Sequence, residues 1–236
     1  MKFFKRLPVI FFLVISISAC KTANTVKVED FKVSMKSPQS VIGEIDLQME
    51  TLMGMGQLKK QTVSVLYFPK EDAICLKYKY EFYNYNQFWD RKGRISFINA
   101  LQKYNEDYNA RNLIKDNKSP QKYGSVRGYL VWQQFSFTVQ AYANMTMYLG
   151  YTFKDRSPYF SVYQREAVYT DDRARDNNRT SPALTMYFTR AQAAELSEIF
   201  EQYIIPDGHL PDSHLQDNIE ESNIPPKKDN VPKDKY

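Results

Sequence analysis

Alternation of apolar and polar residues is the feature that most constrains the fold of this chain. Between residues 74 and 82 every second residue is apolar (Ile, Leu, Tyr, Tyr, Phe), and Cys, Lys, Lys and Glu stand between them. Successive side chains of a strand point to opposite faces, so this period of two predicts a strand with one buried and one wet face. The same reasoning predicts strands over 41–50, 63–67, 159–169 and 183–189, with a hairpin turn at 70–72.

The longest alternating run extends over residues 131–153. As one strand it would be about 70 Å long, far beyond the length of an ordinary strand. The run must therefore reverse direction, but no Gly or Pro lies between Tyr129 and Leu149 to mark the turn. The sequence predicts the reversal without its position.

Two segments change to a period of three to four residues, which predicts amphipathic helices. The first covers about 90–110. The second begins with a capping box formed by Thr189 and Gln192 and ends before Pro206. The predicted apolar stripes are Ile95, Ile98, Leu101, Tyr104 and Tyr108 in the first helix, and Leu196, Ile199, Phe200 and Tyr203 in the second.

These elements predict a single α+β domain over residues 31–205, mainly an antiparallel sheet with the two helices packed on one face. A small β-barrel with flanking helices is the alternative. The segment 206–236 is rich in Pro, Asp, Asn and Lys and poor in apolar residues. This composition predicts a disordered tail.

The N-terminus has the composition of an export signal. Basic residues stand at positions 2, 5 and 6, the apolar run Leu7–Ile15 follows, and Ile17-Ser18-Ala19 leads directly into Cys20. The apolar run is too short to cross a bilayer and has the length found in secretory signal peptides. An ordinary cleaved signal peptide is one interpretation of this segment.

The same order of residues resembles a bacterial lipoprotein precursor. The resemblance implies that residues 1–19 are a signal peptide cleaved before Cys20, and that acyl chains on Cys20 attach the protein to a membrane of the cell envelope. Two acyl chains suffice for stable anchoring. Lys21, rather than an aspartate, follows the cysteine, which by the same resemblance implies the outer membrane. Residues 21–30 would then be a short tether that reaches about 33 Å when extended.

Charge and cysteine content argue against a nucleic-acid partner and against an intramolecular disulfide. Without residues 1–19 the basic and acidic residues nearly balance, which predicts no nucleic-acid partner. Cys75 is the one other cysteine, so an acylated Cys20 leaves no intramolecular disulfide and the hydrophobic core must hold the domain.

The sequence contains few candidates for catalysis. Both histidines, His209 and His214, lie in the predicted tail, and no glycine-rich phosphate loop is present. The loop 170–182 contains Asp171, Asp172 and Asp176, whose oxygens could hold a cation, but arginines between them favour a solvated surface loop. We therefore expect no cofactor, no metal and, on balance, no enzyme.

Aromatic residues give the remaining positive signal, since the chain contains 18 tyrosines and 15 phenylalanines. Tyr83, Tyr85 and Trp89, where the alternation ends before the first helix, are the predicted exposed binding surface. The leading hypothesis is a non-enzymatic envelope lipoprotein that binds an envelope protein or glycan. The alternatives are a carrier of an apolar ligand and a carboxylate-dependent hydrolase.

Overall fold

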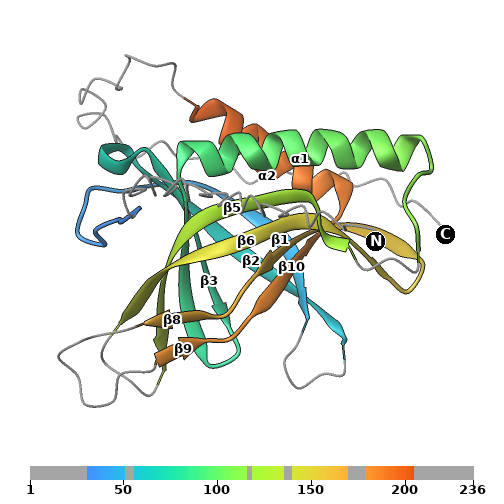
Figure 1. Cartoon of the computed structure of the whole chain (residues 1–236). Coiled ribbons are helices and arrows are strands. Elements are labelled where there is room, and N and C mark those ends of the chain that lie inside the picture. The colour runs from blue at the N-terminus through green and yellow to red at the C-terminus, as the bar shows by residue number, and fades with distance from the viewer. Residues whose placement is uncertain (1–30, 51–55, 116–118, 136–139, 170–178, 205–236) are drawn as a thin grey trace, which may run out of the picture. The chain divides into compact units, whose positions relative to one another are not determined.

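A computed structural model describes residues 31–50, 56–115, 119–135, 140–169 and 179–204. Within these residues, eight antiparallel strands form a closed barrel in the order β1-β10-β7-β6-β5-β4-β3-β2 (Figure 1). The barrel strands are β1 (Ser40–Glu50), β2 (Leu58–Phe68), β3 (Ala73–Tyr80), β4 (Tyr83–Trp89), β5 (Ser119–Gln134), β6 (Ala141–Lys154), β7 (Ser157–Gln164) and β10 (Leu184–Phe188). Strands β8 (Ala167–Tyr169) and β9 (Arg179–Ser181), which lie between β7 and β10 in the sequence, pair with each other in a separate two-stranded sheet.

The prediction of a mainly antiparallel sheet with two helices is confirmed, and the sheet closes as the barrel alternative required. A period of two cannot separate these cases, because a strand of an open sheet and a strand of a barrel both bury one face. The short 3-10 helix η1 (Pro69–Glu71) and Asp72 form the predicted turn between β2 and β3. The run 131–153 reverses between Gln134 and Ala141.

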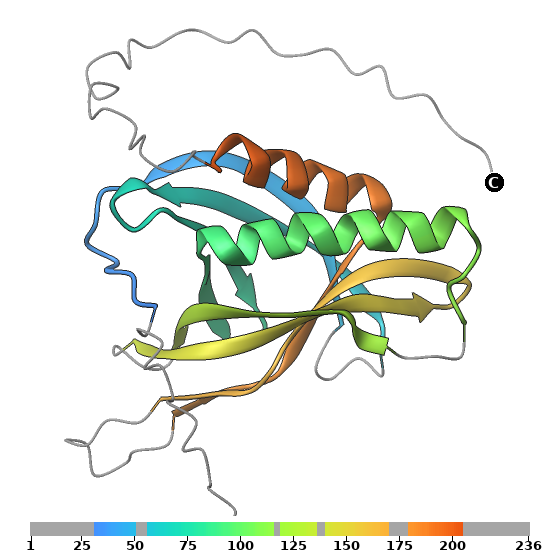
Figure 2. The same ribbon diagram turned by 45° about the horizontal axis from the view of Figure 1, so that its top comes forward.

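Helices α1 (Arg91–Asn109) and α2 (Arg190–Gln202) lie side by side across one end of the barrel (Figures 1 and 2). Asp90 caps α1 by accepting a hydrogen bond from the Gly93 amide at 2.6 Å. The predicted capping box of Thr189 and Gln192 is present at the start of α2. Each helix follows a barrel strand with one intervening residue, so its cap fixes where the chain leaves the barrel wall.

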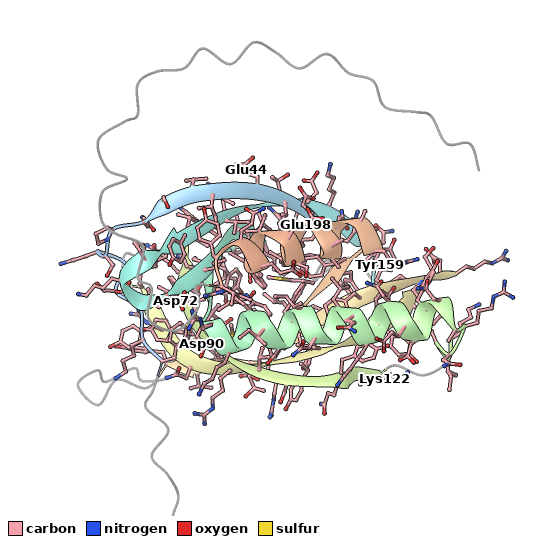
Figure 3. All side chains as sticks on the ribbon, turned by 90° about the horizontal axis from the view of Figure 1, so that it is seen from above. Glu44, Asp72, Asp90, Lys122, Tyr159 and Glu198 are labelled. Atoms are coloured by element: carbon pink, nitrogen blue, oxygen red, sulfur yellow. The ribbon has the colours of Figure 1, made fainter. Side chains whose placement is uncertain are left out.

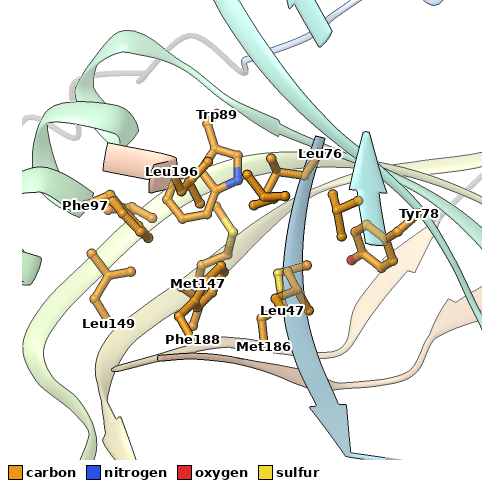
Figure 4. Packing of buried hydrophobic residues seen from close by; sticks show 14 of the residues in the cluster. Leu47, Leu76, Tyr78, Trp89, Phe97, Met147, Leu149, Met186, Phe188 and Leu196 are labelled. Atoms are coloured by element: carbon orange, nitrogen blue, oxygen red, sulfur yellow. The ribbon is translucent and has the colours of Figure 1, made fainter. Parts of the chain in front are cut away.

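The core is a set of interlocked aromatic rings beneath the two helices. Phe97 of α1 contacts Phe200 of α2 and Phe160 of β7, with ring centroids 5.2 and 5.3 Å apart. Trp89 contacts both Phe97 and Phe200. Figure 4 shows Trp89 and Phe97 in this core, close to the side chains of Met147, Leu149 and Leu196.

A second, smaller core lies outside the barrel wall. Residues 31–35 run along the outer face of β2 to β5, where Val33 is buried with Phe68, Phe88 and Tyr129. Burial of this outer face explains why the alternation ends in β4. Phe88 points outward under the N-terminal segment, whereas Gln87 points inward, so the apolar positions no longer follow one face.

Two predictions of which side chains are buried are wrong. Phe82 was expected on the buried face of the strand, but β3 ends at Tyr80 and Phe82 lies in the turn to β4 with 55% of its surface exposed. In α1, Ile95 and Tyr108 are exposed. The buried face of α1 consists of Gly93, Arg94, Phe97, Ala100, Leu101 and Tyr104.

Arg94 joins the two helices to the barrel. Its guanidinium, which has no exposed surface, donates to the Asp72 carboxylate at 2.6 Å and to the carbonyl oxygens of Asp72, Trp89 and Tyr203 at 2.7, 3.1 and 3.1 Å. Asp72 adopts φ 44°, a left-handed conformation that aspartate tolerates better than most residues. Seen from above, Asp72 and Asp90 both lie at the N-terminal end of α1 (Figure 3).

We expect Arg94→Met to lower the free energy of unfolding by about 1–3 kcal/mol, because it leaves three carbonyl oxygens without their buried donor, whereas the partly exposed Asp72 carboxylate keeps Arg91 at 3.4 Å. Urea unfolding measured by circular dichroism tests this. The control is Lys60→Met, which breaks the ion pair between Lys60 and Asp46 at the surface. Equal unfolding midpoints for the two variants would contradict the role given to Arg94.

Candidate functional site

A chain of buried polar side chains crosses the inside of the barrel. The Trp89 indole donates to Gln87 Oε1 at 3.1 Å, Gln87 Nε2 donates to Gln164 Oε1 at 2.9 Å, and Gln164 Nε2 donates to Ser181 Oγ at 3.5 Å. None of the four side chains is exposed to solvent. Because β4 and β7 are not neighbours in the sheet, the bond between the two glutamines spans the interior rather than the wall.

This polar chain separates two different halves of the interior. Toward the helices lie the Phe and Trp rings of the main core. On the other side, the β3–β4 hairpin contributes a tyrosine cluster that consists of Tyr78, Tyr80, Tyr83 and Tyr85. The rings of Tyr78 and Tyr85 stack at 5.2 Å, and those of Tyr83 and Tyr85 lie 5.7 Å apart.

The hydroxyls of Tyr78 and Tyr85 are buried and have no hydrogen-bond partner among the described residues. Burial raises the pKa of both phenols above the ordinary tyrosine value. The nearby Ser181 hydroxyl lowers the pKa of Tyr85 by a smaller amount, although no hydrogen bond of normal geometry joins them. Both phenols are therefore neutral at physiological pH and present unused donors to the interior.

Tyr80 differs from Tyr78 and Tyr85 because its hydroxyl has a hydrogen-bond partner. Its hydroxyl donates to the backbone carbonyl of Glu50 at the end of β1. The Glu50 carboxylate in turn accepts hydrogen bonds from Lys154 at 2.7 Å and from the Tyr187 hydroxyl at 2.8 Å. These contacts join the ends of β1, β3 and β6 to β10 and support a structural role.

Trp132 of β5 lies beside the tyrosine cluster, because it pairs directly across from Tyr85, and it is 3% exposed. The two methionines of β6 belong to the other half of the interior. Met145 and Met147 reach over Gly128, where an added Cβ would lie 2.6 Å from the Met147 methyl carbon and 3.0 Å from the Phe88 carbonyl oxygen. Their flexible side chains therefore fill the space beside Trp89, under the helices.

The predicted exposed surface of Tyr83, Tyr85 and Trp89 is wrong. Tyr85 and Trp89 have no exposed surface, and Tyr83 is partly buried against the core. All three face the interior, because the strand that carries them closes the barrel instead of presenting a free face. The tyrosines remain of interest as interior groups.

Exposed apolar side chains occur instead at the barrel end opposite the helices. The backbone amide of Phe135 donates to the carbonyl of Phe82 at 3.0 Å, which places the β3–β4 and β5–β6 turns side by side. We call the exposed residues here the distal patch: Phe82 (55% exposed), Phe135 (54%), Tyr142 (46%) and Val168 (46%).

The other predicted site residues are not described. Cys20 and the loop residues Asp171, Asp172 and Asp176 lie outside the described residues. Within the described ranges no group of three or more His, Cys, Asp or Glu side chains could hold a metal ion. The buried polar side chains in the same ranges include no Asp or Glu, so they do not supply the carboxylate pair that a hydrolase of the predicted kind requires.

Comparison with known proteins gives one match. A family model described as an uncharacterised Treponema protein covers residues 18–206. The chain belongs to this bacterial family. No curated protein matches it, and no solved structure does.

Among the described residues, no helix combines the length and the apolar character needed to cross a membrane.

Sequence analysis did not identify the interior polar chain. Gln87 gave a usable signal, since it is a polar residue between Tyr85 and Trp89 at an inward-facing position of the strand. Its partner Gln164 lies 77 residues further along the chain, and Ser181, the partner of Gln164, follows 17 residues later. Only the closure of the barrel brings them together.

We expect Tyr78→Phe and Tyr85→Phe to leave the unfolding midpoint of the unliganded protein unchanged or slightly raised, because each removes a buried hydroxyl that bonds to none of the described residues. The matched control is Tyr104→Phe, which removes a hydrogen bond to the Pro158 carbonyl at 3.0 Å. We expect this control substitution to lower the free energy of unfolding by about 0.5–1.5 kcal/mol. Equal losses in all three variants would mean that the two hydroxyls are satisfied in solution.

Proposed function

We propose that the protein is a lipoprotein of the bacterial cell envelope, anchored through acyl chains on Cys20, whose barrel binds a small, largely apolar ligand beside the tyrosine cluster. This develops the carrier alternative of the sequence analysis. The observation that supports it is the pair of stacked, buried tyrosines, Tyr78 and Tyr85, whose hydroxyls have no partner within the part of the chain that the structure describes. Eight-stranded barrels have room either for side chains alone or for one small ligand.

Unsatisfied donors are the strongest physical argument for a ligand. A buried hydroxyl without a partner costs about 1–3 kcal/mol. Two such hydroxyls on adjacent strands, at directly paired positions, double this cost at one place. A ligand with two acceptor oxygens or nitrogens would recover it, which gives the interior a preference for such a molecule over a plain hydrocarbon.

The surrounding side chains narrow the ligand class. The stacked rings of Tyr78 and Tyr85, with Trp132 across from Tyr85, favour a flat molecule that can pack against aromatic faces. No Asp, Glu or Lys is among the buried residues of the described ranges, which favours a neutral ligand.

Binding of an envelope protein or glycan, the leading hypothesis from sequence, rested on an exposed face formed by Tyr83, Tyr85 and Trp89. Because two of these side chains have no exposed surface, that hypothesis loses its original support. The outer membrane remains the proposed location on the strength of the N-terminal residues alone.

Acylation is tested by mass spectrometry of the protein isolated from its producing cell. We expect an N-terminal Cys20 carrying acyl chains, and we expect Cys20→Ser to move the protein out of the membrane fraction. A leader still attached, or an unmodified thiol at Cys20 in membrane-bound protein, would contradict the anchor. Cys75 serves as an internal control, because it is 1% exposed and should carry no modification.

Ligand binding is tested by extracting the same purified protein with organic solvent and identifying the bound small molecules by mass spectrometry. We expect a compound in the wild type that falls roughly tenfold in the double variant Tyr78→Phe/Tyr85→Phe, since two hydrogen bonds contribute about 1.4 kcal/mol or more.

Tyr104→Phe is the matched control for extraction, because Tyr104 lies on α1 in the ring-filled half and its hydroxyl bonds the backbone. It should retain the compound at the wild-type level. Absence of any compound from the wild type, or equal amounts in wild type and double variant, would refute the proposed site. Neither result would bear on acylation.

A further inference from the structure

We infer that the distal patch of Phe82, Phe135, Tyr142 and Val168 docks the barrel on the bilayer to which Cys20 is anchored. The inference rests on the proposed acylation of Cys20. It assigns an interaction surface to the end of the barrel that the helices leave uncovered, and it commits to a lipid surface as the partner.

The exposure of the patch is the first argument. The described residues contain eight large apolar side chains that are exposed, and four of them belong to the patch. Phe82 and Phe135 stand on adjacent turns, joined by a backbone hydrogen bond. Apolar side chains gathered at one end of a protein are typical of interaction sites, whereas scattered ones need no explanation.

The position of the N-terminal chain is the second argument. Phe31, the first described residue, packs its ring on Tyr129 with centroids 6.3 Å apart. Tyr129 in turn contacts Tyr142 of the patch at 6.2 Å, and Tyr142 contacts Tyr169 at 4.8 Å. A continuous row of rings on the outer face of the barrel therefore leads from the start of the described chain to the patch.

The short tether would keep the barrel, and with it the distal patch, close to the bilayer. Residues 21–30 reach at most about 33 Å when fully extended. An acylated Cys20 would thus hold Phe31 within that distance of the bilayer, and Tyr142 lies two ring contacts beyond Phe31. At such a separation an exposed apolar patch encounters the interface continually, and the cost of association in free solution is largely removed.

The chemistry of the patch suits the interfacial region of a bilayer. Phenylalanine buries its ring among acyl chains, and tyrosine keeps a polar tip among the headgroups. The nearby exposed charges are mixed: Lys77, Lys79 and Arg165 are opposed by Glu166 and the half-buried Glu81. Apolar insertion, not attraction to anionic lipid, therefore supplies the docking, and neutral phosphatidylcholine is a sufficient surface.

The test uses the mature acylated protein reconstituted into phosphatidylcholine vesicles with no other protein present. An environment-sensitive fluorophore is attached to a cysteine introduced by Phe82→Cys or Phe135→Cys. Cys20 is blocked by acylation and Cys75 is buried, so the new thiol is the reactive one. Ile114→Cys is the matched control, since Ile114 is 61% exposed but follows the C-terminal end of α1.

We expect lipids brominated in their acyl chains to quench the label roughly twofold or more at positions 82 and 135, with little quenching at 114. Equal quenching at all three positions, or none at 82 and 135, would overturn the inference. Mass spectrometry of Cys20 and flotation of the vesicles are recorded on the same samples. Protein that is acylated and floats but shows no quenching at 82 and 135 refutes docking alone, whereas unmodified Cys20 refutes the anchor and the inference with it.

A second measurement separates insertion from mere closeness. With the label at Val168→Cys, the double substitution Phe82→Ser/Phe135→Ser removes both rings while Cys20 and the tether stay unchanged. We expect quenching to fall to the level of the Ile114 control. Unchanged quenching would mean that the tether alone brings this end to the bilayer, and it would overturn the role of the patch.

Discussion

The buried guanidinium of Arg94 is the interaction on which the arrangement of barrel and helices depends. One side chain bonds the turn between β2 and β3 through Asp72, the end of β4 through Trp89, and the end of α2 through Tyr203. A charge with no exposed surface is costly to bury unless it is paired and hydrogen-bonded, and both terminal nitrogens of Arg94 are bonded, while its Nε has no partner among the described residues. Its position on α1 is therefore correct only when the turn, the strand and the second helix are all in place. This makes Arg94 a source of specificity as much as of stability.

The closure of the barrel explains why the second helix must be held so firmly. Strands β1 and β10 pair through only two described residue pairs, Gln48 with Tyr187 and Met49 with Met186. The first part of β1 has no strand beside it on that side among the described residues, and α2 packs there, with Ile199 close enough to Gly43 to leave little room for a Cβ. A free strand edge is a hazard for aggregation. Helix α2 covers it, and Arg94 bonds the carbonyl of Tyr203 at the end of that helix.

Much of this fold could be predicted from local patterns, and the failures have identifiable causes. The period of two located β1, β3 and β10, and the capping box located the start of α2. Strand β4 was missed because its outer residue Phe88 is buried under residues 31–35, while its inner residue Gln87 is polar. The apolar face of α1 was misplaced for a related reason: Arg94 is buried there, and hydrophobicity alone cannot assign an arginine to a core. In each case a contact distant in sequence reversed the usual preference of a residue.

The candidate site was less predictable than the fold. It is defined by two buried hydroxyls without a hydrogen-bond partner among the described residues, and no sequence motif marks such groups. The sequence indicates Tyr85, but not Tyr78, because Tyr85 stands where the alternation ends before the first helix, and it predicts Tyr85 on the outside. What distinguishes the interior is the contrast between two halves. Under the helices, rings pack edge to face, the Trp89 indole donates to Gln87, and the Tyr104 hydroxyl donates to the Pro158 carbonyl. Beyond Gln87 and Gln164 lie the tyrosine cluster and Trp132, with two donors that have no partner among the described residues. A barrel needed only for stability would gain by phenylalanine at both positions, so the two hydroxyls at one place argue for a molecule that uses them.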